Sequence, residues 1–406
     1  MKILYYSPNP FLNITDSAGY STHIVEMITA FEKMGHTVTV IIAGGTTPRK
    51  VEAVKNNRLK QLLKKIVPSL IWSSLKDIRL IFLDKKLQKI LEKEIKKIEP
   101  DLIYERGSYL QLSGIKGAIK SGTRHIREIN SPFLEEKVKF EGNSLLLGFA
   151  HAKEKKYAAF PSLNVVVSKG LREYLGDIYQ LPVNKICITS NAVNPDKISI
   201  DKIKSQALRQ KMHLNGCTII GFVGSIFSHH SVERLLYAFY DLLALNNDKK
   251  LRVLIVGNGE SLCQLKLLAV ELGISEAVIF TGSVAHKDIY NYIDIMDICV
   301  LPGSNWYGSP VKIFEYGLLA KAIVAVNTKP VVDVMDCGIH GLICQPTKES
   351  FSKAIKKLID NPILAKEMGD KFQKKVLNEY TWQHMAKKVM RAYIDSHSNL
   401  ATANEI

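Results

Sequence analysis

The sequence predicts an α/β protein built from two doubly wound parallel sheets, each covered by helices. Three observations predict this class. The 406 residues are too many for one core of ordinary size, since domains usually run to about 100–200 residues. Short β-branched runs alternate with segments of helical spacing. This alternation ends near residues 191–204 and then begins again, so we expect two domains in series.

The first half predicts five strands, each a short apolar or β-branched run. They are expected at residues 3–6, 37–42, 101–104, 125–129 and 164–167. Between the first two strands, residues 18–34 have helical spacing, and Gly35 is a good helix stop.

The second half repeats the pattern and then ends in helices. Strands are expected at residues 218–223, 252–256, 277–280, 298–301 and 322–326. Helices are expected at residues 232–245, 262–272, 288–295, 310–319, 348–360, 363–380 and 381–396, followed by a tail from residue 399. We therefore expect an N-terminal domain over residues 1–196 and a second domain over 197–380, with residues 381–406 packing back on the first domain before the tail.

Ligands of open parallel sheets bind beyond the carboxyl ends of the strands. Two such domains that face each other place a cleft between those ends. The alternative is two independent domains on a linker.

The net charge of +16 favours an anionic partner. Residues 49–99 hold 15 basic and 6 acidic residues, and 15 − 6 gives +9. Two apolar series of helical spacing lie within residues 59–98, namely Ile71, Leu75, Ile78 and Phe82, then Leu87, Leu91, Ile95 and Ile98. A basic amphipathic segment of this kind favours contact with an anionic membrane surface. The alternative is ordinary helices packed on the sheet with a solvated basic face.

Several classes of protein are disfavoured. No apolar stretch reaches roughly 18 residues, and the N-terminus lacks the features of a signal peptide, so we expect a cytoplasmic protein. The six cysteines form no C-x-x-C pair, which disfavours a zinc or redox motif, and Cys187 and Cys299 are expected in the core. The basic segment lacks a nucleic-acid reader motif, so no nucleic-acid partner is expected.

The most informative stretch is residues 308–317. Ser309 suits the cap of a helix and Pro310 its first turn. The N–H groups of that turn attract phosphate, and Lys312 adds a full positive charge. Glu315 lies one turn further on, where a carboxylate can bind two ribose hydroxyls. The alternative for Glu315 is a solvated helical carboxylate.

Two further loops follow predicted strands. Gly224 and Ser225 come directly after a buried run, so their N–H groups can approach a diphosphate. His230 in the same loop is a phosphate contact or a surface residue. Asn130 or Glu128 is expected to meet the acceptor or the donor sugar, the alternative being turn residues before a proline.

One more loop precedes the first helix, where Gly19 permits close approach of an anion or a sugar. The chain contains no G-x-G-x-x-G motif and no P-loop, which counts against a dehydrogenase or an ATPase.

In their order and spacing these motifs resemble family 4 of the retaining glycosyltransferases, which have the GT-B fold of two Rossmann-like domains facing each other across a cleft. The resemblance covers nearly the whole chain. It depends on the loop of Gly19, on residues 190–194 at the domain join, and on the motifs at 223–225, 256–259, 280–284 and 309–315.

The resemblance implies transfer of a sugar, with retention, from a UDP- or GDP-linked donor to a hydroxyl of a glycan or glycolipid. The leaving phosphate would help to deprotonate the acceptor, without a cofactor or a metal. It implies a role in cell-surface polysaccharide or glycolipid biosynthesis, and the basic segment at residues 59–98 favours a location at the inner face of the plasma membrane. It also implies catalytic roles for Glu315, Lys312 and Asn130, and donor contacts from Gly19, Gly224, Ser225, His230, Gly282, Val284, Ser309, Lys312 and Glu315.

The chain departs from the family pattern at two places. Tyr307 stands where many members have a second glutamate, and Ser225 and His230-Ser231 replace an arginine and a Lys-Gly pair. These departures motivate one alternative, a nucleotide-sugar-binding module without catalysis. A further alternative is a sugar-nucleotide epimerase of the same fold.

Overall fold

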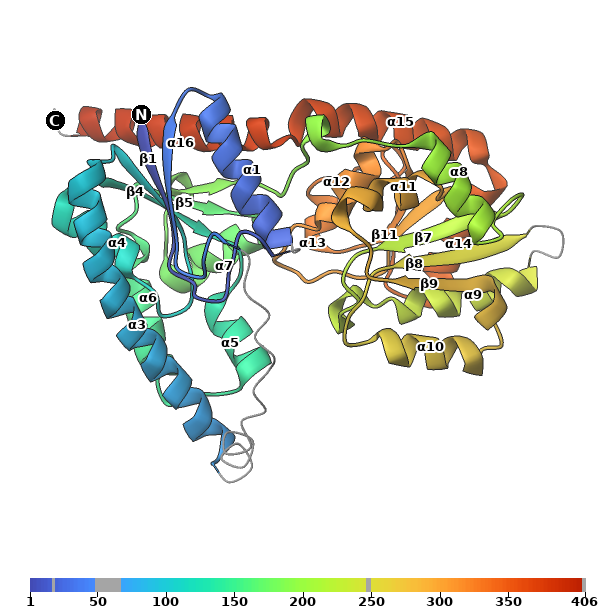
Figure 1. Cartoon of the computed structure of the whole chain (residues 1–406), viewed down its shortest axis with the longest axis horizontal. Helices are drawn as coiled ribbons and strands as arrows, with labels where there is room; N and C mark the ends of the chain where they lie inside the picture. The colour runs from blue at the N-terminus through green and yellow to red at the C-terminus, as the bar shows by residue number, and fades with distance from the viewer. Residues whose placement is uncertain (17–18, 48–66, 246–249, 404–406) are drawn as a thin grey trace. The chain divides into compact units, whose positions relative to one another are not determined.

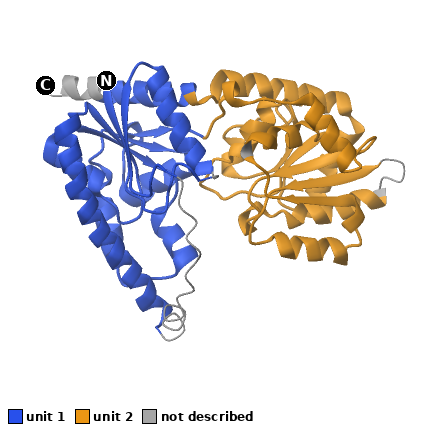
Figure 2. Ribbon diagram, in the orientation of Figure 1, with its two compact units in different colours: residues 1–190, 383–406 blue, residues 191–382 orange. Residues whose placement is uncertain are grey.

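The computed structural model describes residues 1–16, 19–47, 67–245 and 250–403. The chain forms two compact units, one of Met1–Ser190 with Gln383–Ile406 and one of Asn191–Trp382, coloured separately in Figure 2. The chain therefore returns to unit 1 for its last helix. Parts of two predicted segments, residue 18 of the first helix and residues 59–66 of the basic segment, lie outside the described residues.

Unit 1 contains a sheet of six parallel strands in the order β2-β1-β3-β4-β5-β6. The strands are β1 (Lys2–Ser7), β2 (Thr37–Ile42), β3 (Leu102–Arg106), β4 (Arg124–Ile129), β5 (Leu163–Val166) and β6 (Ile186–Ile188). The five predicted strands are confirmed. The sixth, β6, was not predicted because it has three residues at the edge of the sheet, too few to show a period.

Helices flank this sheet in Figure 1. They are α1 (Gly19–Lys33), α3 (Ser69–Ile98), α4 (Ser113–Ser121), α5 (Phe133–Glu141), α6 (Leu147–Ala158), α7 (Lys169–Tyr179) and α16 (Trp382–Ala403). The predicted tail from residue 399 is wrong, since α16 continues to Ala403. The reason is that residues 399–403 contain good helix formers and no glycine or proline to end the helix.

The core of unit 1 holds charged side chains as well as apolar ones. His125 of β4 lies 2.8 Å from the Glu105 carboxylate of β3, and Arg127 donates to Glu154 of α6 at 2.8 Å. All four residues are buried. Because each of the two carboxylates has a hydrogen-bonding partner on a neighbouring element, the unit can bury these polar side chains.

The helix α3 is a single helix whose two halves bury different faces. Its C-terminal half packs Leu91 and Ile95 into the core, as the apolar spacing predicted. In its N-terminal half the apolar series Ile71, Leu75, Ile78 and Phe82 is exposed, at 46%, 52%, 40% and 66%. The polar residues Ser73, Ser74, Asp77 and Asp84 are buried instead. The alternative of ordinary helices packed on the sheet therefore fails for this half.

Buried polar contacts explain the reversed half of α3. The Lys137 ammonium of α5 lies 2.8 Å from the Asp77 carboxylate, and Tyr109 donates to the same carboxylate. Asp84 accepts from the N–H groups of Leu112 and Ser113 at the start of α4. These bonds hold the polar face inward, so the apolar face points away from the unit.

Unit 2 contains a second sheet of six parallel strands in the order β12-β11-β10-β7-β8-β9. The strands are β7 (Thr218–Val223), β8 (Leu251–Val256), β9 (Val278–Gly282), β10 (Ile298–Leu301), β11 (Ala322–Val326) and β12 (Leu342–Cys344). The helices are α8 (Lys202–Lys211), α9 (Glu233–Leu245), α10 (Leu262–Glu271), α11 (Ile289–Asp294), α12 (Val311–Leu318), α13 (Lys329–Val332), α14 (Lys348–Asp360) and α15 (Pro362–Glu379). The helix α8, the single turn α13 and the short edge strand β12 were not predicted.

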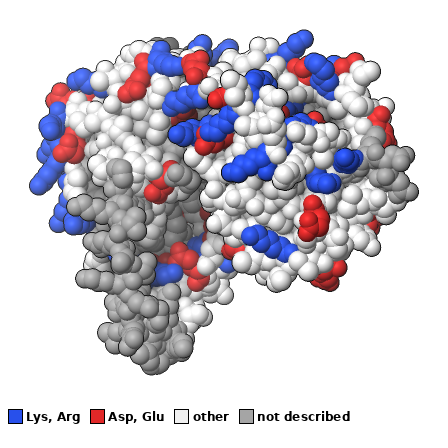
Figure 3. Space-filling view, turned by 45° about the vertical axis from the view of Figure 1, so that its right-hand side comes forward, with Lys and Arg blue, Asp and Glu red and all other residues white. Residues whose placement is uncertain are grey.

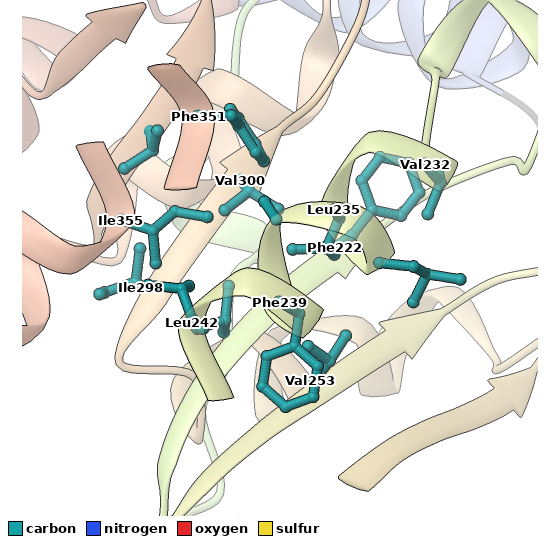
Figure 4. Packing of buried hydrophobic residues seen from close by; sticks show 14 of the residues in the cluster. Phe222, Val232, Leu235, Phe239, Leu242, Val253, Ile298, Val300, Phe351 and Ile355 are labelled. Atoms are coloured by element: carbon teal, nitrogen blue, oxygen red, sulfur yellow. The ribbon is translucent and has the colours of Figure 1, made fainter. Parts of the chain in front are cut away.

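Helices cover both faces of this sheet, which explains why its strands are apolar without alternation. On one face Phe222 and Val300 pack against Phe239 of α9 and Phe351 of α14 (Figure 4). On the other face the sheet packs against α11 and α12. Both α/β units are thus of the predicted class.

The positive charge is spread over the surface. On the face shown in Figure 3, lysine and arginine side chains alternate with acidic ones, so this face carries no continuous basic field. Among the described residues, no helix has an apolar stretch long enough to cross a bilayer.

Candidate active site

A cluster of predicted site residues lies at the carboxyl ends of β7 and β10 in unit 2. These two strands are neighbours in the sheet, and β10 leads into α12 while β7 leads toward α9. The loop after β7 supplies Gly224, Ser225 and His230, and the first turn of α12 supplies Lys312. This is the edge where ligands of parallel sheets bind.

Gly224 brings the backbone and the lysine together. Its φ angle is +136°, and a Cβ at this position would lie 2.8 Å from Cε and 3.1 Å from Nζ of Lys312. Any larger residue would displace the lysine or strain the backbone. The loop after β7 therefore requires glycine at this point.

Lys312 is a buried cation, only 8% exposed. Its Nζ lies 4.6 Å from the centre of the Phe222 ring and 3.1 Å from Nε2 of His230. No carboxylate of the described residues forms an ion pair with it. Burial lowers the pKa of Lys312 to about 7, although Glu315 opposes this shift. A buried ammonium without an acidic partner is suited to an anionic ligand.

His230 orients this lysine. Its Nδ1 lies 2.5 Å from the carbonyl oxygen of Ser225, which can only accept, so Nδ1 carries the proton and Nε2 accepts from Lys312. Burial, Lys312 and His229 together lower the pKa of His230 to about 3, so the ring is neutral. Both ring nitrogens have partners, and this geometry makes His230 a support for Lys312.

Glu315 lies on the next turn of α12 and is 9% exposed. Burial raises its pKa to about 7, and Lys312 opposes this shift. The alternative of a solvated helical carboxylate is therefore wrong. None of the described groups hydrogen-bonds to this carboxylate, so it can accept from a ligand.

The start of α12 differs from the prediction. Ser309 does not cap the helix, which begins at Val311 with Pro310 in the cap position and no side-chain cap bond. Instead the Ser309 hydroxyl accepts from the backbone N–H of Asn191 at 2.8 Å, and the Ser309 carbonyl accepts from the Asn191 side chain at 2.6 Å. This tertiary contact holds the serine away from the helix. The N–H of Ile313 donates to the Pro310 carbonyl at 3.2 Å, whereas those of Val311 and Lys312 point to no acceptor among the described residues.

Two predicted donor contacts, Gly282 and Val284, lie at the end of β9 and just after it. The Gly282 carbonyl accepts from the Gly257 N–H at 3.0 Å and from the Thr281 hydroxyl at 2.9 Å. Val284 is partly buried against the core. The Gly282 carbonyl is thus already bonded within unit 2. Tyr307, in the loop between β10 and α12, is buried.

The predicted residues of unit 1 lie near the carboxyl edge of its own sheet. Glu128 is 1% exposed and accepts from Tyr104 at 2.6 Å and from Asn130 at 2.6 Å, and it also pairs with Arg106 and His23. Burial alone would raise the pKa of Glu128, but His23 and Arg106 hold it well below its usual range. Glu128 is thus occupied, whereas the half-buried Asn130 is the residue left to meet a sugar.

Sequence reasoning missed several of these partners. Arg106 and Tyr104 belong to a run, LIYER, whose polar residues at a strand end were the available signal. Asn191 and Phe222 gave no separate signal. Gly19 begins α1 and is exposed, and the two residues before it lie outside the described part of the chain.

Two family models match the chain, one over each unit. The model described as Glycosyltransferase Family 4 matches residues 17–197, and the model described as Glycosyl transferases group 1 matches residues 204–375. Together they include every predicted site residue.

Relatives with curated descriptions are distant. An uncharacterized glycosyltransferase of Methanocaldococcus jannaschii is 22% identical over 56% of this chain and 59% of its own length. The chain thus spans less than two thirds of that relative. The alpha-monoglucosyldiacylglycerol synthase of Streptococcus pneumoniae is 23% identical over 93% of this chain and 83% of its own length.

The fold is similar to that of solved structures. HepE of Anabaena, in complex with UDP and glucose, superimposes with a TM-score of 0.70 at 14% identity, covering 97% of this chain and 100% of that one. At this identity the likeness establishes the two-domain architecture.

Proposed function

Since the chain belongs to the family 4, group 1 glycosyltransferases and has the GT-B fold, we propose that it moves a sugar from a nucleoside-diphosphate donor to a hydroxyl acceptor with retention. One observation carries the donor assignment. Lys312, which is buried and has no acidic partner among the described residues, lies at the uncapped start of α12, one turn from the buried carboxylate of Glu315. A diphosphate at the first and a ribose at the second fit this spacing.

Each residue then has a role. Lys312, the first N–H groups of α12 and the backbone of Ser225 hold the diphosphate, and the backbone near Val284 holds a uracil or guanine base. The Gly224 N–H donates to the Val256 carbonyl at 2.9 Å, so this glycine contributes close approach of the backbone and no donor, contrary to the prediction. Gly19 and Asn130 of unit 1 meet the sugar or the acceptor. The complex of HepE with UDP supports the choice of donor.

The chemical step needs little from the protein beyond charge and position. The bond between the anomeric carbon and the diphosphate oxygen breaks, and the acceptor oxygen bonds to that carbon on the same face. The hydroxyl proton passes to the leaving diphosphate. Lys312 stabilises the charge that develops there, an effect that is large in a buried site. We therefore expect transfer to continue in the presence of a chelator.

The donor assignment predicts selective stabilisation by sugar nucleotides. A panel of UDP and GDP sugars, tested by thermal unfolding, should contain at least one that raises Tm. A ligand at 100 times its Kd stabilises a protein by about 2.7 kcal/mol. Lack of stabilisation across the whole panel would contradict the proposal.

Product analysis separates the alternatives. NMR of the product should show the anomeric configuration of the donor. A binding module would be stabilised without turnover on any acceptor, and an epimerase would convert the donor sugar without an acceptor.

The exposed face of α3 supports a second part of the proposal, contact with an anionic membrane. The apolar series Ile71, Leu75, Ile78 and Phe82 forms one stripe, and every lysine and arginine of this helix is exposed. The acidic residues Asp77 and Asp84 are buried. An apolar stripe beside cations is complementary to a bilayer with anionic headgroups. The name of the S. pneumoniae relative, a diacylglycerol glycoside synthase, agrees with a lipid acceptor.

Removing the stripe should weaken membrane binding. The double variant Ile78→Ser, Phe82→Ser should bind phosphatidylglycerol vesicles at least 10-fold more weakly, since burying one such side chain contributes about 1.5–3 kcal/mol. Co-sedimentation measures this. The matched control is Leu267→Ser, Val270→Ser, which alters two exposed apolar residues of α10. Equal binding by both double variants, or equal binding of the wild type to neutral vesicles, would refute membrane contact. If the wild type forms a dimer and the α3 double variant does not, the apolar stripe serves self-association and not membrane binding.

A further inference from the structure

We propose that Asn191 is a positioning residue for the donor, because it keeps Ser309 away from the start of α12 and so leaves that helix end open to phosphate. This rests on the proposed function. It assigns a role in the donor site to a residue at the join between the two units.

The local sequence by itself favours a closed helix end. Serine followed by proline is a preferred cap and first turn, and a serine cap stabilises a helix about fivefold. With Ser309 as the cap, its hydroxyl would accept from the N–H of Val311 or Lys312. Those N–H groups are the ones that the diphosphate is proposed to bind. A capped α12 would therefore compete with its own ligand.

The structure shows the opposite arrangement. Asn191 binds Ser309 twice, through its backbone N–H to the hydroxyl at 2.8 Å and through its side-chain amide to the carbonyl at 2.6 Å. Pro310 has an extended ψ of 106°, so it is outside the helix and not in its first turn. The contact with Asn191 thus overrides a local preference, which is a common sign of a functional site.

Asn191 is itself held in place. Two residues further on, Val193 donates to the Tyr380 carbonyl at 3.0 Å and accepts from the Trp382 N–H at 3.2 Å. Ala192 and Val193 are buried. The two points at which the chain passes between the units therefore lie side by side, and they anchor the asparagine that holds Ser309.

Removing the Asn191 side chain tests the proposal, because the proposal predicts the direction of each change in nucleotide affinity. Asn191→Ala removes the amide that bonds to the Ser309 carbonyl and keeps the backbone N–H that bonds to the hydroxyl. Ser309 is then held by one bond in place of two, so capping of α12 should compete better and weaken binding of UDP or GDP, whichever binds the wild type, up to about 5-fold in calorimetry. The double variant Asn191→Ala, Ser309→Ala should recover affinity relative to Asn191→Ala, because alanine cannot cap. Ser309→Ala alone provides the reference for the cycle. A double variant as weak as or weaker than Asn191→Ala would overturn the proposal.

The matched control is Asn194→Ala. Its side chain accepts from the Asp196 N–H at 3.1 Å in the same segment. Its nucleotide affinity should equal that of the wild type. An equal loss in Asn194→Ala would show that the segment as a whole, and not Asn191, supports the site.

A ligand-free measurement separates this proposal from the proposed function. Amide hydrogen exchange of Val311 and Lys312 should slow about 5-fold in Asn191→Ala and return to the wild-type rate in the double variant. Unchanged exchange would refute the capping competition even if a donor binds. Failure of every nucleotide to bind, with the exchange pattern present, would refute only the donor assignment.

Discussion

Replacing Glu315 with alanine is expected to lower kcat/KM for the donor by about 10²-fold, the larger part of it in donor binding. A hydrogen bond to a charged group contributes about 1.5–3 kcal/mol, and the Glu315 carboxylate is proposed to accept two such bonds from the ribose hydroxyls. Glu315 is buried and has no partner among the described residues, so these bonds are not offset by losing others. Initial rates with varied donor and saturating acceptor measure the effect.

Two comparisons make this result specific to the site. Glu271→Ala removes an exposed glutamate of α10 and should leave the rates unchanged. The wild type should bind a 2′-deoxy form of the donor more weakly than the ribose form. The Glu315→Ala variant should bind the two forms with equal affinity. If the variant still discriminates between the two donors, Glu315 does not bind the ribose.

Apolar elements of this fold were predictable from sequence because their signals are local. The strands β7, β10 and β11 match their predicted bounds, since each is a run of apolar residues that the structure buries on both faces. The edge strands β6 and β12 have three residues each, so no period could reveal them. The division between the units falls at Ser190 and Asn191.

The errors arose where tertiary contacts outweigh local preference. Ser309 has the sequence of a helix cap, but Asn191, 118 positions away, binds it. The apolar series that begins at Ile71 has the spacing of a packed helix face, but buried bonds of Asp77 and Asp84 turn it outward. The burial of Glu128 and the neutral state of His230 likewise depend on partners distant in sequence. Sequence reasoning thus proposed Lys312, Glu315 and His230 for the site, but it did not predict that His230 contacts Lys312 or that Asn191 binds Ser309.

Replacing Lys312 with methionine is expected to weaken nucleoside-diphosphate binding and to lower kcat by about 10²-fold or more. The loss of one preorganised group that stabilises developing negative charge has effects of this size. Methionine keeps the apolar stem beside Phe222 and removes only the charge. Lys353→Met, at an exposed position of α14, is the control. An unchanged Kd for UDP and GDP in Lys312→Met would show that the diphosphate does not bind at this helix end.

The pH dependence gives a second test of Lys312. Its pKa is lowered to about 7 in the free protein, so above pH 7 the side chain is largely neutral. A bound diphosphate favours the charged form and raises this pKa, so binding at pH 8 should take up about one proton. Affinity should therefore fall as the pH rises above 7. Below pH 7 the carboxylate of Glu315, whose pKa is about 7, becomes protonated and accepts ribose bonds less well, so affinity should fall there also.

The Lys312→Arg variant tests the predicted fall in nucleotide affinity above pH 7 separately from the fall below it. Arginine keeps its charge at every pH in the range, so Lys312→Arg should lose the decline above pH 7 and keep the decline below it. Calorimetry in two buffers of different ionisation enthalpy measures the proton uptake, which should vanish at pH 8 in this variant. Proton uptake that persists in Lys312→Arg would mean that another group titrates on binding. In that case Lys312 would not be the group that takes up a proton when the diphosphate binds.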